Sequence, residues 1–126
     1  MIFGERVERM ITVMLVVLGI ATNATASVLI KYAMMPERNV SILEPVSIIV
    51  NVPLWFGLLF FCVAFLIYAF ILQRLPLNVS YPILTSGSIT LVSILSVFFF
   101  DEAVTVEKIV GVMLIIIGVT LISLKV

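Results

Sequence analysis

Four long stretches without a charged residue run through this chain, and they limit its possible folds more than any other feature. They are Met10–Ile30, Pro45–Gln73, Leu75–Phe100 and Ile109–Leu124. As a helix the first stretch would be about 31 Å long, which matches a bilayer core of about 30 Å. A helix pairs its own backbone polar groups, as lipid demands, so we read each stretch as a transmembrane helix.

Composition supports the same class of protein. Hydrophobic residues make up 63% of the chain and charged residues 11%, against about 45–50% and about 25% in soluble domains. We therefore predict an all-α integral membrane four-helix bundle, with residues 1–126 forming one domain and helices near 7–33, 53–73, 76–100 and 105–124. A four-helix bundle fills its own centre with side chains, so a transport pathway would need a dimer.

Several kinds of chemistry lack the residues they need. Cys62 is the only cysteine and the chain has no histidine, so we expect no metal site, no cofactor and no disulfide. We find no candidate catalytic residues and expect no enzyme activity. The net charge is zero, which argues against nucleic acid as a partner. No ionisable residue lies centrally in a span, where proton-coupled pumps usually place one.

The first span carries polar and small residues at a spacing of four. Gly19, Asn23, Ser27 and Lys31 fall on one slowly drifting face. One interpretation is a cavity wall, in which Asn23 binds a polar substrate group and Lys31 meets an anionic group near the interface. The other is a packing seam with Asn23 bonded across helices and Lys31 extended to the headgroups.

The third span combines helix-breaking residues with hydroxyl groups. Pro82 removes a backbone hydrogen bond, and Gly87 adds a second weak point. Ser86 and Thr90 share one face. We favour a helix that bends at Pro82 and Gly87 beside a substrate path over a static bend within a packing face.

The remaining helices give weaker signals. The second span holds many aromatic residues, which could stack on an aromatic cation. Because no acidic residue accompanies them, we interpret them mainly as lipid-facing or core side chains. Gly111 and Gly118 in the fourth span are two turns apart, and we predict that they form a dimer interface. The short connection at Arg74 and Pro76 predicts that the second and third spans are antiparallel neighbours.

The distribution of positive charges barely fixes the orientation. Arg6, Arg9, Arg74 and Lys125 lie on one side, against Lys31, Arg38 and Lys108 on the other. The slight excess favours cytoplasmic termini, and the near balance also permits insertion in both orientations and hence an antiparallel dimer.

Four stretches together resemble the small four-helix members of the drug/metabolite transporter superfamily. They are Ala26–Ala33, Leu75–Ile83, Ser93–Glu102 and Ile109–Val119. Within that superfamily, small multidrug resistance exporters work as antiparallel dimers and use a central glutamate. The resemblance places that glutamate at Asn23 and the drug-contacting tryptophan at Leu84, so this chain lacks both groups.

Tyr81-Pro82 and the missing glutamate look more similar to the subunits that flip aminoarabinose-linked undecaprenyl phosphate, and to single EamA-type repeats. The resemblance implies a multi-pass subunit of the bacterial inner membrane that translocates a lipid-linked sugar or a similar polar metabolite, as a homodimer or with a related four-helix subunit. Alternatives are a cation exporter subunit whose partner supplies the acid, or a non-transporting assembly partner. The predicted substrate-binding residues are Asn23, Ser27, Lys31, Tyr81, Ser86 and Thr90.

Overall fold

The computed structural model describes residues 2–124 and is helical almost throughout. Its elements are α1 (Ile2–Ala33), a 3-10 turn η1 (Pro36–Arg38), α2 (Pro45–Ile49), α3 (Val52–Leu72), α4 (Leu77–Phe100) and α5 (Val106–Ser123). α1, α3, α4 and α5 are long and apolar enough to cross a membrane. This confirms the prediction of an all-α membrane four-helix bundle. Lys125, which we counted toward the orientation, lies outside the described residues.

Local sequence explains where the long helices begin and end. α3 has a proline in its first turn, where the missing N–H costs nothing. Asp101 ends α4 in the left-handed conformation, with φ of 51°, a common helix stop. Thr105 starts α5, because its hydroxyl accepts a hydrogen bond from the Lys108 backbone N–H at 3.2 Å.

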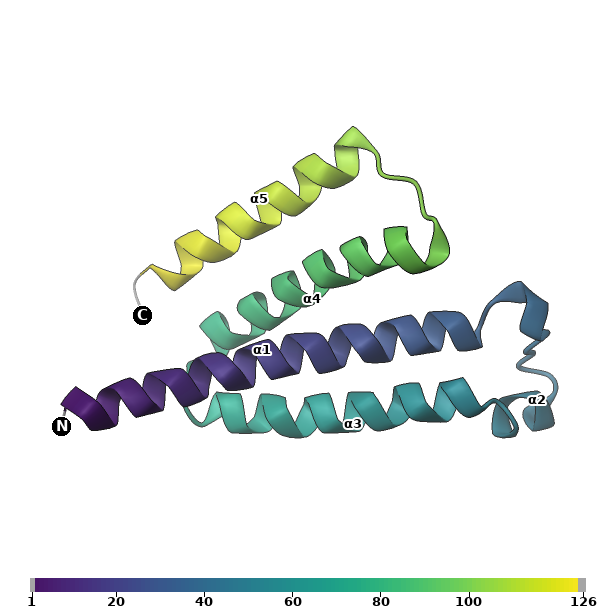
Figure 1. Ribbon diagram of the computed structural model, residues 1–126, viewed down its shortest axis with the longest axis horizontal. Helices are drawn as coiled ribbons and strands as arrows, with labels where there is room; N and C mark the ends of the chain where they lie inside the picture. Colours follow the sequence, from purple (N-terminus) through teal and green to yellow (C-terminus); the bar gives the residue numbers. More distant parts are fainter. Residues whose placement is uncertain (1, 125–126) are drawn as a thin grey trace.

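α1 is the centre of the bundle. It packs broadly against α3 and α4, whereas α3 and α4 touch each other only sparsely. Figure 1 shows α1 lying between them. The expectation that the second and third spans are neighbours is therefore wrong for most of their length. The tight turn after Leu72 reverses the chain, but α1 occupies the space that the two helices leave between them.

Small residues explain why α1 holds this position. Gly19, Ala24, Ala26 and Ala33 are its buried residues. Lipid tails are as apolar as leucine, so helices in a bilayer associate by close van der Waals contact, which small residues allow. On the facing helix Gly57 is buried as well, and a Cβ added to it would meet Ala26 and Ile30. The α1–α3 contact is therefore a close approach of two backbones.

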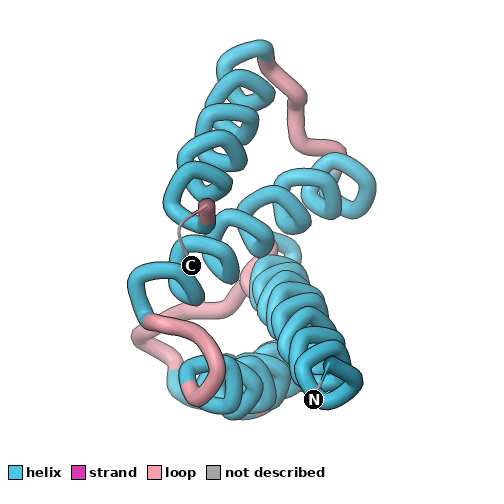
Figure 2. The backbone as a smooth tube through the Cα atoms, turned by 90° about the vertical axis from the view of Figure 1, so that its left-hand side faces the viewer, coloured by secondary structure: helices cyan, strands magenta, loops and turns pink. Residues whose placement is uncertain are grey.

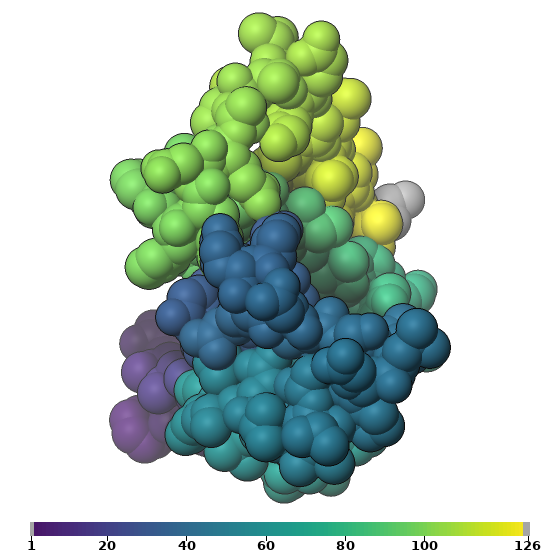
Figure 3. Space-filling view, turned by 90° about the vertical axis from the view of Figure 1, so that its right-hand side faces the viewer, coloured from purple at the N-terminus to yellow at the C-terminus, as the bar shows by residue number. Residues whose placement is uncertain are grey.

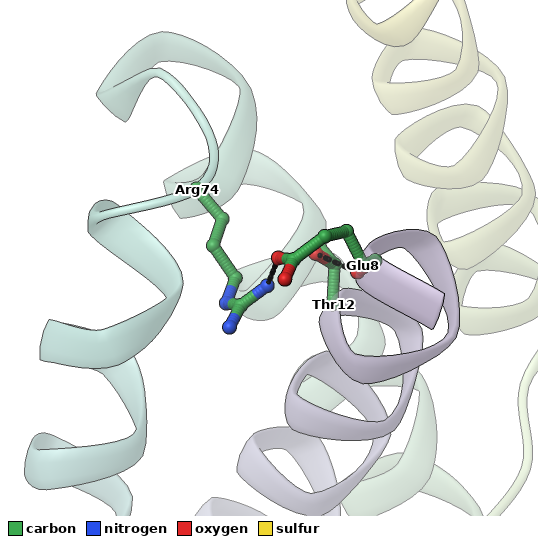
Figure 4. A network of polar contacts seen from close by, with 3 residues as sticks. All are labelled: Glu8, Thr12 and Arg74. Atoms are coloured by element: carbon green, nitrogen blue, oxygen red, sulfur yellow. Dashed lines mark hydrogen bonds and ion pairs between the residues drawn. The ribbon is translucent and has the colours of Figure 1, made fainter. Parts of the chain in front are cut away.

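Polar contacts link both ends of α3 to α1. Glu8 of α1 forms an ion pair with Arg74, which follows α3, and the Thr12 hydroxyl donates to the Glu8 carbonyl at 2.9 Å (Figure 4). At the opposite end the Asn51 side-chain amide donates to the Ala33 carbonyl at 2.8 Å. Both ends of α3 are thus held to α1.

α5 stands apart from this core. It packs mainly on α4, and none of its residues is buried. Figure 2 shows α5 projecting away from the α1–α3 pair. The bundle therefore consists of a packed three-helix core and one helix with most of its surface uncovered.

Candidate functional site

A polar contact joins α1 to α4 within the membrane-spanning part. The Asn23 side-chain amide donates to the Ser88 hydroxyl oxygen at 2.9 Å. Ser88 is buried and Asn23 is partly buried. This bond uses one of the two N–H groups of Asn23 and leaves its other N–H and its carbonyl oxygen for a further partner. Asn23 therefore combines a packing contact with a remaining capacity to bind.

Asn23 lines an open cavity bordered by α1, α3 and α4, which we call the central cavity. Its volume is about 720 Å³, within the usual range for small-molecule sites of about 300–1,000 Å³. It is lined by Gly19, Asn23, Ser27, Phe61, Ala64, Phe65, Tyr68, Tyr81, Leu84, Thr85, Ser88, Ile89, Val92 and Ser93. Among residues 2–124, no acidic or basic side chain is part of this lining.

Aromatic rings form one side of the central cavity. Tyr68 of α3 and Tyr81 of α4 meet edge to face, with ring centroids 6.4 Å apart and planes at 68°, and Phe61 and Phe65 of α3 continue this side. Such a wall can stack against a ring or the apolar face of a sugar. Sequence reasoning treated the aromatic residues of α3 as filler. The missed signal is the Tyr68 hydroxyl, a polar group in an otherwise apolar span.

The hydroxyl groups around the cavity fall into two kinds. Ser27 donates to the backbone carbonyl of Asn23 at 3.0 Å, and Ser93 donates to the backbone carbonyl of Ile89 at 2.7 Å. Their protons are used within their own helices, so these groups can only accept. Within the described part of the chain, the hydroxyls of Thr85 and Ser88 have no such acceptor. Neutral donors and acceptors therefore line the cavity together.

A second cavity lies beside the first, between α4 and α5, and we call it the lateral groove. Its volume is about 930 Å³, its walls are mostly apolar, and the end of α1 contributes Val28 and Lys31. Ser27, Val92 and Ser93 line both cavities, so the two cavities adjoin at these side chains. The lateral groove also has charged groups along its edge, namely Lys31, Glu102 and Lys108.

The six predicted substrate-binding residues divide between these cavities. Asn23 and Tyr81 line the central cavity, Lys31 and Thr90 line the lateral groove, and Ser27 lines both. Ser86 is buried and lines neither, and its hydroxyl donates to the Ile83 carbonyl at 3.1 Å. Five of the six residues therefore line two adjacent cavities instead of a single one, and Ser86 lines neither.

The two predicted bending points lie within a continuous helix. α4 runs through Pro82 and Gly87 without interruption, so a functional bend there stays a prediction. Gly87 has a clear local role, because a Cβ at this position would collide with the side chain of Ile20. The absence of a side chain allows α4 to approach α1 just beside the Asn23–Ser88 bond.

The two glycines predicted at a dimer interface are partly buried, and Gly111 lines the lateral groove. A Cβ added at Gly111 or Gly118 would meet no atom within 4 Å. Within residues 2–124, nothing in the chain itself therefore requires a glycine at either position for packing.

Comparisons with known proteins agree with this architecture. The family model for the Small Multidrug Resistance protein matches residues 10–115. A curated relative, the probable 4-amino-4-deoxy-L-arabinose-phosphoundecaprenol flippase subunit ArnE of Pseudomonas fluorescens (strain Pf0-1), is 38% identical over 70 residues, which cover 56% of this chain and 60% of the relative. The chain thus spans less than two thirds of that relative's length. No solved structure matches the chain. Both descriptions point to transport rather than catalysis.

Proposed function

The chain belongs to the small multidrug resistance family and is an integral multi-pass protein of the inner membrane, and from this premise we propose that it is a transporter subunit for a lipid-linked sugar of the polyprenyl-phosphate type. The observation that carries the proposal is the chemistry of the central cavity. Its lining combines an asparagine, hydroxyl groups and aromatic rings, and it holds no acidic or basic side chain among the described residues.

An uncharged cavity of this kind favours a polar, hydroxyl-rich group over an organic cation. A bare cation inside a membrane needs a counter-charge, because burying an unpaired charge is costly. At the position where the family's exporters carry a glutamate, this chain has Asn23. An amide pairs well with sugar hydroxyls as both donor and acceptor, and the faces of Tyr68 and Tyr81 suit the apolar face of a sugar ring.

In this proposal the adjoining lateral groove holds the phosphate and the hydrocarbon chain of such a substrate. Lys31 sits at its edge, near the end of α1, where an ammonium group can meet a phosphate in the headgroup layer. The apolar walls of α4 and α5 suit a hydrocarbon chain. In this proposal the sugar enters the central cavity past Ser27 and Ser93, while the phosphate stays near Lys31 and the tail remains in the lateral groove.

A partner completes the pathway in this proposal. No residue of α5 is buried, and a Cβ at either of its glycines would meet no atom within 4 Å, which suits contact with a second copy or a related four-helix subunit. The relative found by comparison is itself named as a subunit.

The test measures movement of a polyprenyl-phosphate sugar across reconstituted vesicles with Asn23→Ala and Lys31→Ala. We expect each variant to lower the initial rate, Lys31→Ala by about tenfold because a hydrogen bond to a charged group is lost. Thr25→Ala is the matched control for Asn23, because Thr25 bonds to the Ala21 carbonyl and lines neither cavity. Arg9→Ala, at the other end of α1, controls for Lys31. Undiminished rates in both cavity variants would refute the proposal.

The same vesicles test whether the chain alone is a cation exporter. A pH gradient should drive no uphill uptake of a quaternary cation by this chain alone. Coupled uptake would replace the lipid-linked sugar with a cationic substrate as the best account of the central cavity.

A further inference from the structure

The connection between α1 and α3, residues 34–51, exposes large apolar side chains. Exposed fractions are 89% for Ile42, 90% for Leu43, 67% for Val46, 63% for Ile49 and 67% for Val50. Connections on a water-exposed surface are usually polar. A cluster of exposed aliphatic side chains in one short segment indicates a surface that another apolar phase covers.

Several polar groups of this connection are paired within the chain, whereas the Asn51 side-chain carbonyl oxygen is buried without a partner among the described residues. The Ser47 hydroxyl accepts from the Ser41 backbone N–H at 3.2 Å and donates to the Glu44 carbonyl at 2.6 Å. The Trp55 indole N–H donates to the Ile49 carbonyl at 2.9 Å. α2 begins with Pro45, which has no N–H to leave unpaired. A segment in contact with hydrocarbon needs this internal pairing, whereas a segment in water does not.

The connection is fastened to the end of α1. Asn51 is only 5% exposed, and its side-chain amide donates to the Ala33 carbonyl at 2.8 Å. Ala33 lies two residues after Lys31. Nearby, the Arg38 guanidinium carbon stands 4.4 Å from the centroid of the Tyr32 ring. Charged and aromatic groups thus surround the end of α1, a combination typical of the headgroup layer.

We propose that residues 40–51 are a membrane-interface anchor, with Ile42, Leu43 and Val46 inserted among the acyl chains of one leaflet. Through Asn51 the anchor holds the end of α1 in the headgroup layer, and with it Lys31. This role is independent of the transport proposed above, since it requires only a lipid bilayer as partner.

Lipid fits this surface better than a protein partner does. The exposed aliphatic residues continue directly into the exposed apolar face of α3, which begins with Val52, Trp55 and Phe56. α3 is one of the membrane-spanning helices, so the same acyl phase borders both segments. Figure 3 views the molecule from this end, where the blue connection lies on the outside of the bundle.

The test is a depth measurement in nanodiscs of phosphatidylethanolamine and phosphatidylglycerol. A nitroxide label is attached to Leu43→Cys or, as a matched control in the same connection, to Glu37→Cys, each in a Cys62→Ser background. We expect the label at position 43 to collide mainly with oxygen, which concentrates in lipid, and the label at position 37 mainly with a water-soluble nickel chelate. A label at position 43 that behaves as in water overturns the proposal. So does one shielded from both reagents and dipole-coupled to a second copy, which would identify a protein partner.

A second measurement follows α1 itself. A label at Tyr32→Cys reports the depth of the helix end with the anchor intact, with Ile42→Asp and Leu43→Asp combined, and with Glu44→Gln as a control. We expect the double aspartate variant to increase nickel collisions at position 32 and the control to leave them unchanged. An unmoved label in the double variant would contradict the proposed hold on α1.

Discussion

Glycines on α3 and α5 have opposite surroundings, although both helices are apolar spans. A Cβ at Gly57 of α3 would lie 2.7 Å from the Cγ1 atom of Ile30 and 3.3 Å from the Ala26 carbonyl oxygen. At Gly111 and Gly118 of α5 it would meet nothing within 4 Å. The α1–α3 contact is therefore complete within one chain, whereas the surface of α5 is left for another contact. The same residue type thus has different consequences in the two regions.

The largest expected effect comes from filling the complete contact. Gly57→Leu should lower the free energy of unfolding by about 1–3 kcal/mol, because the added side chain meets a backbone carbonyl that cannot move aside without separating α1 from α3. Unfolding in mixed detergent micelles measures the loss. Gly111→Leu is the control and should leave this value nearly unchanged. Equal losses in both variants would remove the distinction between the two regions.

The next effect concerns the uncovered helix. Gly118→Leu should preserve the stability of the single chain but weaken its association by about tenfold, or about 1.4 kcal/mol, because close helix contact depends on small residues. Subunit counting by photobleaching in vesicles at several protein-to-lipid ratios measures association. If the variant associates as well as the unaltered protein, α5 makes its outside contacts through another face.

A smaller effect on the free energy of unfolding is expected for the cavity hydroxyls. It distinguishes Ser88, which bonds to another helix, from Ser93, which bonds only within its own helix. Ser88→Ala removes the acceptor of the Asn23 amide and should cost about 0.6 kcal/mol, a typical value for a hydrogen bond between membrane helices. Ser93→Ala should cost less, because that hydroxyl bonds only to its own helix. The same unfolding assay compares them. A larger loss in Ser93→Ala would argue against the Asn23–Ser88 bond as a link between α1 and α4.

The smallest effect lies at the edge of the core. Arg74→Ala removes the ion pair with Glu8, and we expect a loss of a few tenths of a kcal/mol because the Glu8 carboxylate is exposed and salt screens the pair. Unfolding at low and high ionic strength measures it. The difference between the variant and the unaltered protein should shrink at high salt, and a difference independent of salt would show that the ion pair is not its source.

The candidate site was only partly predictable from the sequence. Asn23 was predicted as a site residue because it interrupts an apolar span. The four-residue spacing predicted that Ser27 lies on the same face of the helix. Tyr68 and Ser88 were missed because their importance depends on contacts with residues on other helices. Ser86 was included for its hydroxyl, but that group bonds within α4. No pattern within one helix distinguishes a hydroxyl that faces a cavity from one that its own backbone has satisfied.

The sequence by itself determined the four spans and their membrane location. Whether a stretch enters lipid depends on the summed transfer free energy of about 20 consecutive residues, which is a local property. Only the tertiary structure decided that α1 separates α3 from α4, that Asn23 meets Ser88 and that the polar residues divide between two cavities. Apart from the polar residues on one face of α1 and the hydroxyl groups of α4, these spans are apolar, so periodicity gives little indication of which face packs. That choice depends on close contacts between small residues far apart along the chain.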